Sequence, residues 1–310
     1  MSGPTWSLAE MPDLTGRRGL VTGVTGGIGE HTALELARSG AEVILAGRSE
    51  EKLSAVVDDI RRTLPNAVLR PVVMDLADLA SVRRAAAEAS TYGPLDILVN
   101  NAGVMATPAR RTADGFDLQM GTNHFGHFAL TGLLLPQLVA SGSARVVTLA
   151  SQMHRVARSV PVTDPRVDHG GYNKWRSYGQ SKLANLLFML ELDRRARAAD
   201  LPITSVGAHP GYAATNLMSA GLGMHGRTAE GSIIQAATRV LAQPAEMGAL
   251  PSLMAATMPG LPGGAYLGPS GPGEMRGAPT IVRTSRQARD PELAAALWRV
   301  SEEATGVTYP

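Results

Sequence analysis

The 310-residue sequence has no cysteine, few aromatic residues and almost no net charge. The absence of cysteine excludes disulfides, thiol nucleophiles and thiolate metal sites, and it is typical of a protein of the reducing cytoplasm. Four Phe, three Trp and six Tyr, with a formal charge of +2, provide neither a stacking platform nor a basic stripe. We therefore do not expect a nucleic-acid partner.

Hydrophobic segments that could enter a membrane are also scarce. Residues 1–11 include Glu10 and have no charged segment ahead of an apolar run, so we expect no signal peptide. Residues 118–144 lack Asp, Glu, Lys and Arg and are long enough to span a bilayer. Asn123 and Pro136 interrupt this stretch, so we expect a buried helix and no membrane span.

Short apolar runs alternate with amphipathic segments through the first two thirds of the chain. The pattern predicts strands at 18–23, 41–46, 68–74, 95–100, 145–150 and 203–209, and helices at 27–39, 50–64, 79–92, 123–140 and 178–199. Strands that alternate with helices form βαβ units. The sequence therefore predicts an α/β fold, a single-domain doubly wound parallel sheet with helices on both faces.

The pattern loosens after residue 210, where only a short strand at 264–267 and a final helix at 291–305 are predicted. We expect one domain over residues 1–310. Its parts are an N-terminal arm at 1–13, substrate-cover loops at 152–177 and 212–229, and a C-terminal extension at 260–310.

A glycine-rich turn follows the first predicted strand. Gly23, Gly27 and Gly29 allow a tight turn, close approach of the backbone to a diphosphate and close contact between helix and strand. The spacing is G-x-x-x-G-x-G, whereas the usual dinucleotide fingerprint is G-x-G-x-x-G. That fingerprint occurs at 221–226, but no strand precedes it there, so we interpret it as a chance match.

Arg48 follows the second predicted strand, near the position where NAD-binding sites carry an acidic residue. Gly47 stands in place of that acid, and a guanidinium can bind the 2′-phosphate of NADP in a bidentate manner. The sequence therefore favours NADP(H) over NAD(H). The alternative is that Arg48 is a solvated loop charge.

Tyr178 and Lys182 are one helical turn apart, so their side chains share a helix face. The ammonium group, together with an oxidised nicotinamide, is expected to lower the phenol pKa by about 3 units, a preference of roughly 4 kcal/mol for phenolate. Tyr178 is then a general acid or base for a carbonyl or alcohol oxygen. Ser151, at the end of the fifth predicted strand, would stabilise the same oxygen. The alternative is an exposed Tyr and Lys on an amphipathic helix.

Taken in order, these motifs resemble the short-chain dehydrogenase/reductase superfamily and its retinol-dehydrogenase-type branch. The resemblance extends over about residues 14–216, and its segments are Thr22–Gly29, Asp75–Leu76, Asn100–Gly103, Asn123–Phe128, Ser151, Tyr178–Lys182 and His209–Gly211. It departs from the branch pattern at Thr25-Gly26, where the branch has Asn-Ser, and at Ala150, where it has a serine. We expect no N-terminal membrane anchor of the kind that the branch carries.

The resemblance implies a Rossmann fold, a nicotinamide cofactor and a role for each matched residue. The implied catalytic residues are Ser151, Tyr178 and Lys182, with Asn123 holding a water in a proton relay. The implied cofactor-binding residues are Gly23, Thr25, Gly27, Ile28 and Gly29 of the turn, Arg48, Asp75 and Leu76 at the adenine, Asn101, Ala102 and Gly103 in the cleft, Tyr178 and Lys182, and Pro210, Gly211 and Thr215 at the nicotinamide and its phosphates.

The sequence therefore predicts an NADP(H)-dependent oxidoreductase that transfers hydride between nicotinamide and an apolar carbonyl or alcohol substrate. A non-redox reaction on the same scaffold, such as epimerisation or dehydration, and a catalytically silent NADP-binding regulator are the alternatives. No metal site is expected, because His124 and His127 have no neighbouring carboxylate and no His-Glu-x-x-His motif occurs. Relatives pair the helices at 123–140 and 178–199, so a homodimer or homotetramer is expected; alternatively, the C-terminal extension covers those helices in a monomer.

Overall fold

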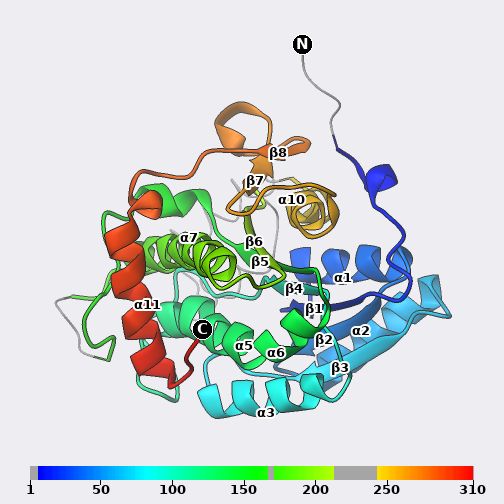
Figure 1. The fold of residues 1–310 in the computed structure, drawn as a ribbon, viewed down its shortest axis with the longest axis horizontal. Helices are drawn as coiled ribbons and strands as arrows, with labels where there is room; N and C mark the ends of the chain where they lie inside the picture. The colour runs from blue at the N-terminus through cyan, green and yellow to red at the C-terminus, as the bar shows by residue number, and fades with distance from the viewer. Residues whose placement is uncertain (1–5, 167–170, 213–242, 310) are drawn as a thin grey trace.

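An eight-stranded sheet runs through the computed structural model, which describes residues 6–166, 171–212 and 243–309 (Figure 1). The strand order is β3-β2-β1-β4-β5-β6-β7-β8, and every neighbouring pair is parallel except β7 and β8. The strands are β1 (Arg18–Thr22), β2 (Glu42–Gly47), β3 (Leu69–Val73), β4 (Ile97–Asn100), β5 (Ala144–Leu149), β6 (Ile203–Ala208), β7 (Tyr266–Pro269) and β8 (Pro279–Ile281). The strand order reverses between β1 and β4, and ligands of such sheets bind at the carboxyl ends of the strands beside that reversal.

Helices cover both faces of this sheet. The described helices are α1 (Ile28–Arg38), α2 (Glu50–Thr63), α3 (Leu79–Ser90), α4 (Leu118–Met120), α5 (Gly126–Leu133), α6 (Leu135–Ala140), α7 (Lys174–Ala198), α10 (Ala245–Thr257) and α11 (Pro291–Thr305), with short helical turns η1 (Leu8–Glu10), η2 (Gly121–Phe125), η3 (Gln152–Arg155), η4 (Pro272–Glu274) and η5 (Gln287–Arg289). One core contains α1, α2 and α10, and the other contains α3, α5, α6, α7 and α11. Figure 1 shows the two layers, with α10 above the sheet and α3, α5 and α6 below it.

The predicted single-domain α/β fold is confirmed. The predicted strands and helices through β6 are present within a few residues, with one exception among the helices. The single helix predicted at 123–140 is wrong. The chain instead forms α4, the π-helical turn η2, α5 and α6, because η2 interrupts the regular turns and Pro136 begins a new helix. The long helix predicted at 178–199 begins four residues earlier, where the Asn173 side chain accepts hydrogen bonds from the backbone N–H groups of Trp175 and Arg176.

Among the described residues after 210, helix α10 and strand β8 were not predicted. Helix α10 packs against α1 and against β5, β6 and β7, so it has no polar face, and Pro251 inside it further obscures the helical pattern. Strand β8 has only three residues and begins with a proline. The strand predicted at 264–267 is present as β7, shifted by two residues. The glycine pattern at 221–226 lies outside the described residues.

Helix α11 and the residues after it lie across α5 and α7 (Figure 1). The rings of Phe128, Phe188, Trp298 and Tyr309 form one aromatic cluster, and a Cβ on Gly132 would lie 2.5 Å from the Val307 side chain. The C-terminal part of the same chain thus packs on helices that the sequence analysis expected to meet a partner subunit. No helix within the described ranges is both long enough and apolar enough to cross a membrane.

Candidate active site

A cleft of about 940 Å³ opens along the carboxyl ends of the central strands. The predicted site residues that line it are Gly23, Thr25, Ile28, Gly29, Arg48, Asp75, Leu76, Asn101, Ala102, Gly103, Ser151, Tyr178, Lys182, Pro210 and Gly211. Gly27 caps the N-terminus of α1 beside the cleft, and Asn123 lies behind its wall. Thr215 and most of the loop predicted at 212–229 lie outside the described residues, as do 167–170 of the other predicted loop.

The glycine turn between β1 and α1 has no room for side chains. A Cβ on Gly29 would lie 2.4 Å from both Asn101 Nδ2 and the Gly23 carbonyl oxygen, and one on Gly23 would lie 2.9 Å from the Ala102 backbone. The first N–H groups of α1 have no acceptor within the helix, and the helix dipole adds positive potential there. The turn therefore has the shape and charge to bind a diphosphate.

Thr22 ties this turn to the end of β4. Its hydroxyl oxygen accepts hydrogen bonds from the N–H groups of Asn101 and Ala102, at 3.0 and 2.9 Å, and it lies 2.9 Å from His127 Nε2. Asn101 Nδ2 donates to the Thr22 carbonyl oxygen at 2.6 Å. The two backbone segments predicted to bind the cofactor are thereby held in one rigid unit.

The adenine side of the cleft carries Arg48, Asp75 and Leu76. Arg48 is exposed, and no ion pair or hydrogen bond joins its side chain to another described residue. The Asp75 carboxylate accepts a hydrogen bond from the Ala77 N–H at 2.9 Å, which fixes the turn after β3. An exposed guanidinium at this edge is available to an anionic group, so the described residues fit a phosphorylated dinucleotide.

Tyr178 and Lys182 lie together at the centre of the cleft, and each is 4% exposed. Lys182 Nζ is 5.7 Å from the centroid of the Tyr178 ring and donates to the Leu149 carbonyl oxygen at 3.3 Å. A Cβ on Gly103 would lie 3.0 Å from Asn123 Oδ1 and 3.6 Å from Lys182 Nζ, so these groups converge on the end of β4. The predicted sharing of a helix face by Tyr178 and Lys182 is confirmed.

Burial dominates the ionisation of both groups. Burial raises the pKa of Tyr178 to about 12, although a hydrogen bond from the Ser151 side chain acts to lower it. Burial also lowers the pKa of Lys182 to about 8. Loss of hydration thus raises the pKa of the phenol in the protein without cofactor, and the expected joint effect of Lys182 and an oxidised nicotinamide stays a prediction.

Asn123 belongs to η2 and is completely buried. Its side chain binds both sides of the Val104 peptide, accepting from the N–H at 2.7 Å and donating to the carbonyl oxygen at 2.9 Å, and it also donates to Ser181 at 2.9 Å. It therefore fixes the cleft wall after Gly103 and the helix that carries Lys182. The proposed relay water at Asn123 stays a prediction.

The sequence analysis missed several residues of the cleft wall. Those that no motif or predicted loop marked include Met105, Thr107, Glu274 and Met275, whereas Gln152 and Met153 begin the cover loop predicted at 152–177. Glu274 and Met275 come from a turn after β7, in a stretch rich in glycine and proline, and reach the cleft only through the folding of the chain. No local pattern could have identified them.

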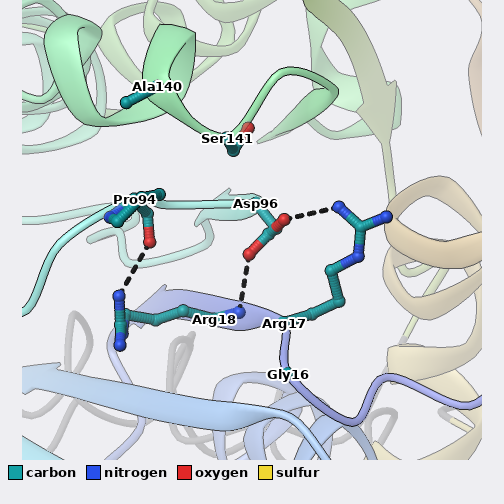
Figure 2. A pocket seen from close by; sticks show the side chains of 7 residues that line it. All are labelled: Gly16, Arg17, Arg18, Pro94, Asp96, Ala140 and Ser141. Carbon is teal, nitrogen blue, oxygen red and sulfur yellow. Dashed lines mark hydrogen bonds and ion pairs between the residues drawn. The ribbon is translucent and has the colours of Figure 1, made fainter.

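A second cavity, of about 400 Å³, lies at the amino ends of β1 and β4 (Figure 2). Its charged side chains are paired with other residues of the chain. Arg17 pairs with Asp96 at 2.6 Å, and Arg18 pairs with Glu42 at 2.8 Å and donates to the Pro94 carbonyl oxygen at 2.9 Å. Because these charges are already neutralised by one another, we interpret this cavity as a structural feature at the amino ends of the central strands and not as a ligand site.

The family model described as short chain dehydrogenase matches residues 18–163. Retinol dehydrogenase 13 of Homo sapiens is 38% identical to this chain over 300 residues, which cover 96% of this chain and 87% of that protein. Polyprenol dehydrogenase of Mus musculus is 40% identical over 307 residues, which cover 96% of this chain and 86% of that protein.

Solved structures share the fold of this chain. A protein from Mycobacterium paratuberculosis has a TM-score of 0.82 at 40% identity, and the match covers 99% of this chain and 100% of that chain. A protein described as an NAD(P)-dependent gluconate 5-dehydrogenase from Beutenbergia cavernae, solved with NADP bound at low occupancy, has a TM-score of 0.59 at 27% identity. That match covers 79% of this chain and 91% of the other.

Proposed function

Because the chain belongs to the short-chain dehydrogenase/reductase family, in its retinol-dehydrogenase-like branch, we propose that it is an NADP(H)-dependent oxidoreductase that interconverts an apolar carbonyl compound and its alcohol. The observation that carries this proposal is the burial of Tyr178 and Lys182 side by side in a cleft that the glycine turn also lines. A silent cofactor-binding protein would not need that pair together with Ser151.

The bound nicotinamide supplies the hydride for reduction and accepts it in oxidation. Tyr178 is the proton donor in reduction: with its pKa near 12 it keeps its proton at neutral pH and can give it to the oxygen of a carbonyl group. Ser151 adds a hydrogen bond to the same oxygen as negative charge develops there. In oxidation Tyr178 must first lose its proton, so that direction is favoured at higher pH.

Arg48 supports the choice of NADP(H). Its exposed guanidinium stands at the adenine edge of the cleft without a partner among the described residues, and Gly47 places no carboxylate there to repel a phosphate. The NADP bound to the Beutenbergia cavernae protein agrees with this choice.

The substrate half of the cleft supports an apolar substrate. Met105, Met153, Met275 and Trp175 line it, and methionine side chains adapt their shape to varied apolar groups. The related retinol and polyprenol dehydrogenases are named for long isoprenoid alcohols. We therefore propose a hydrophobic alcohol, aldehyde or ketone as substrate.

Two further properties stay proposals. The absence of cysteine supports a cytoplasmic location. A homodimer or homotetramer was expected from the apolar helices, but α11 of the same chain occupies part of the face formed by α5 and α7. Light scattering of the purified protein distinguishes a monomer from an oligomer.

The test is a panel of hydrophobic aldehydes, ketones and alcohols, assayed with each nicotinamide cofactor. We expect turnover with part of the panel and tighter binding of NADPH than of NADH. Arg48→Gln should weaken NADPH binding by about tenfold and leave NADH binding unchanged, because a charge-assisted contact to phosphate is lost. Equal affinity for both cofactors in the wild-type protein would contradict the role of Arg48, and binding without turnover would contradict the enzymatic proposal.

A further inference from the structure

Glu274 enters the active-site cleft from the turn after β7. Gly273 and Glu274 both have left-handed backbone conformations, with φ of 63° and 55°. Such angles are uncommon for residues other than glycine, and they recur where surrounding contacts hold a side chain for a function. The turn packs directly on Gly211, since a Cβ there would lie 2.3 Å from the Met275 carbonyl oxygen.

The Glu274 carboxylate joins three side chains from two other segments. It accepts hydrogen bonds from His209 Nε2 at 3.0 Å, from Gln152 Nε2, and from Arg155 Nη2 at 3.1 Å. The Gln152 amide is oriented for this contact, because its oxygen accepts a hydrogen bond from Arg155 Nε at 2.7 Å. Three of the roughly four acceptor positions of a carboxylate are thereby used.

The hydrogen bonds of His209 define its tautomer. Nδ1 lies 3.2 Å from the Gly211 backbone N–H and accepts from it, so the proton is on Nε2 and points to Glu274. Burial lowers the pKa of His209 to about 3, which keeps the ring neutral at working pH. The ring fits closely against β7, where a Cβ on Gly268 would lie 2.0 Å from Nε2.

These contacts join the segments that follow two paired strands, β5 and β6. Gln152 follows Ser151 after β5, whereas His209 precedes Pro210 and Gly211 after β6, and residues of both segments line the cleft. The C-terminal segment also contacts the residues after β5 through His154. The Ser285 N–H donates to His154 Nε2 at 3.2 Å, and His154 Nδ1 donates to the Ser151 carbonyl oxygen at 2.7 Å.

We propose that Glu274 is a positioning residue that holds the segment Ser151–Gln152 in place relative to the segment His209–Gly211, beyond the end of the β5–β6 pairing, and thereby sets the fit of the substrate. The inference rests on the proposed function, and it assigns to the C-terminal extension a part in substrate recognition. None of these Glu274 contacts reaches the glycine turn or Arg48, so the contacts of those residues with the cofactor do not depend on Glu274.

Three variants separate the contacts of the carboxylate. Glu274→Ala removes all of them, Glu274→Gln keeps an oxygen that can accept from His209 and Gln152 but loses the charge facing Arg155, and Arg155→Gln removes only the guanidinium. Glu303→Ala, on an exposed part of α11, is the matched control. We expect Glu274→Ala to raise KM for a carbonyl substrate at least about tenfold, and the other variants to stay within about threefold of wild type.

The dissociation constant of NADPH and the thermal midpoint of unfolding distinguish positioning from a general structural role. The proposal expects both to remain close to wild type in Glu274→Ala. An unchanged KM in Glu274→Ala, an equal loss in Glu274→Gln, or a parallel loss of NADPH binding and thermal stability would each overturn it.

A readout without turnover separates this proposal from the proposed function. In NMR spectra of the wild-type protein and of Glu274→Gln, the Nε2 proton of His209 should be observable and protected from exchange with water. In Glu274→Ala that proton should exchange rapidly. Equal protection in all three proteins would overturn the assigned contact even if no substrate were ever turned over.

Discussion

The amino ends and the carboxyl ends of the central strands carry different kinds of side chains. At the amino ends, charged side chains are paired: Arg17 with Asp96 (Figure 2), and both Arg18 and Arg70 with Glu42. At the carboxyl ends, glycines leave the backbone bare, and no carboxylate pairs with Arg48 or Lys182 among the residues that the structure describes.

This difference shows where the sheet is built for stability and where it is built for binding. Paired charges at the amino ends fix strand positions and leave nothing for a ligand. The carboxyl ends keep the ammonium group of Lys182 and the phenol of Tyr178 buried, which costs folding free energy and is typical of a functional site.

The largest contrast between the two ends should come from glycine substitutions. Gly29→Ala places a methyl group against Asn101 and Gly23, so we expect NADPH affinity to fall at least about 100-fold. Gly16→Ala, at the amino end, has φ of 80° but open space, so it should lower stability by about 1 kcal/mol and leave affinity unchanged. Calorimetric titration and thermal unfolding measure both effects; unchanged affinity in Gly29→Ala would contradict the binding role of the turn.

A charge at the amino end should matter for stability alone. Asp96 accepts from the Arg17 side chain and from the Arg18 N–H, at 2.6 and 2.8 Å. Asp96→Ala leaves these donors without a partner, so we expect the free energy of unfolding to fall by about 1–2 kcal/mol, since Arg17 is half exposed. Urea denaturation measures this loss, and kcat/KM should not change. A fall in kcat/KM of more than about threefold would mean that the two ends are not independent.

The smallest contrast concerns acid stability. Burial lowers the pKa of His127 to about 4, whereas an unfolded histidine titrates near 6.5. The unfolded chain therefore binds the extra proton between these values, and stability is lost as pH falls from about 6.5 toward about 4, by about 1.4 kcal/mol per pH unit. His127→Asn removes this contribution.

Unfolding of wild type and His127→Asn by urea, at about pH 7 and about pH 5.7, tests this assignment. The variant should lose less stability between the two conditions, by about 1 kcal/mol. An identical loss in both proteins would show that His127 is not held neutral in the folded state.

The sequence predicted what repeats locally and missed what depends on distant contacts. The strands through β6 and the glycine turn follow from period and turn chemistry, and the spacing of Tyr178 and Lys182 fixed their shared face. Helix α10 was missed because contacts on every side remove the polar stripe that marks a surface helix. The interruption of the helix predicted at 123–140 had no signal beyond Pro136.

The site residues that belong to a sequence motif could be predicted, whereas those that the C-terminal segment contributes, such as Glu274, could not. His154 and His209 had no predicted role, because their importance comes from partners more than fifty residues away, at Ser285 and Glu274. The burial of Tyr178, which raises the pKa of its phenol, could not be predicted, because spacing along a helix gives proximity to Lys182 but not the depth of burial.

The most direct test of the account is a single turnover of NADPH-loaded protein with an accepted carbonyl substrate, in wild type and in Tyr178→Phe. The account predicts that loss of the phenol hydroxyl slows NADPH oxidation by about 10²–10⁴-fold, because the proton donor is gone. NADPH affinity should stay within about twofold, since the glycine turn is untouched. A Tyr178→Phe rate within about tenfold of wild type would contradict the account, because another group would then be donating the proton.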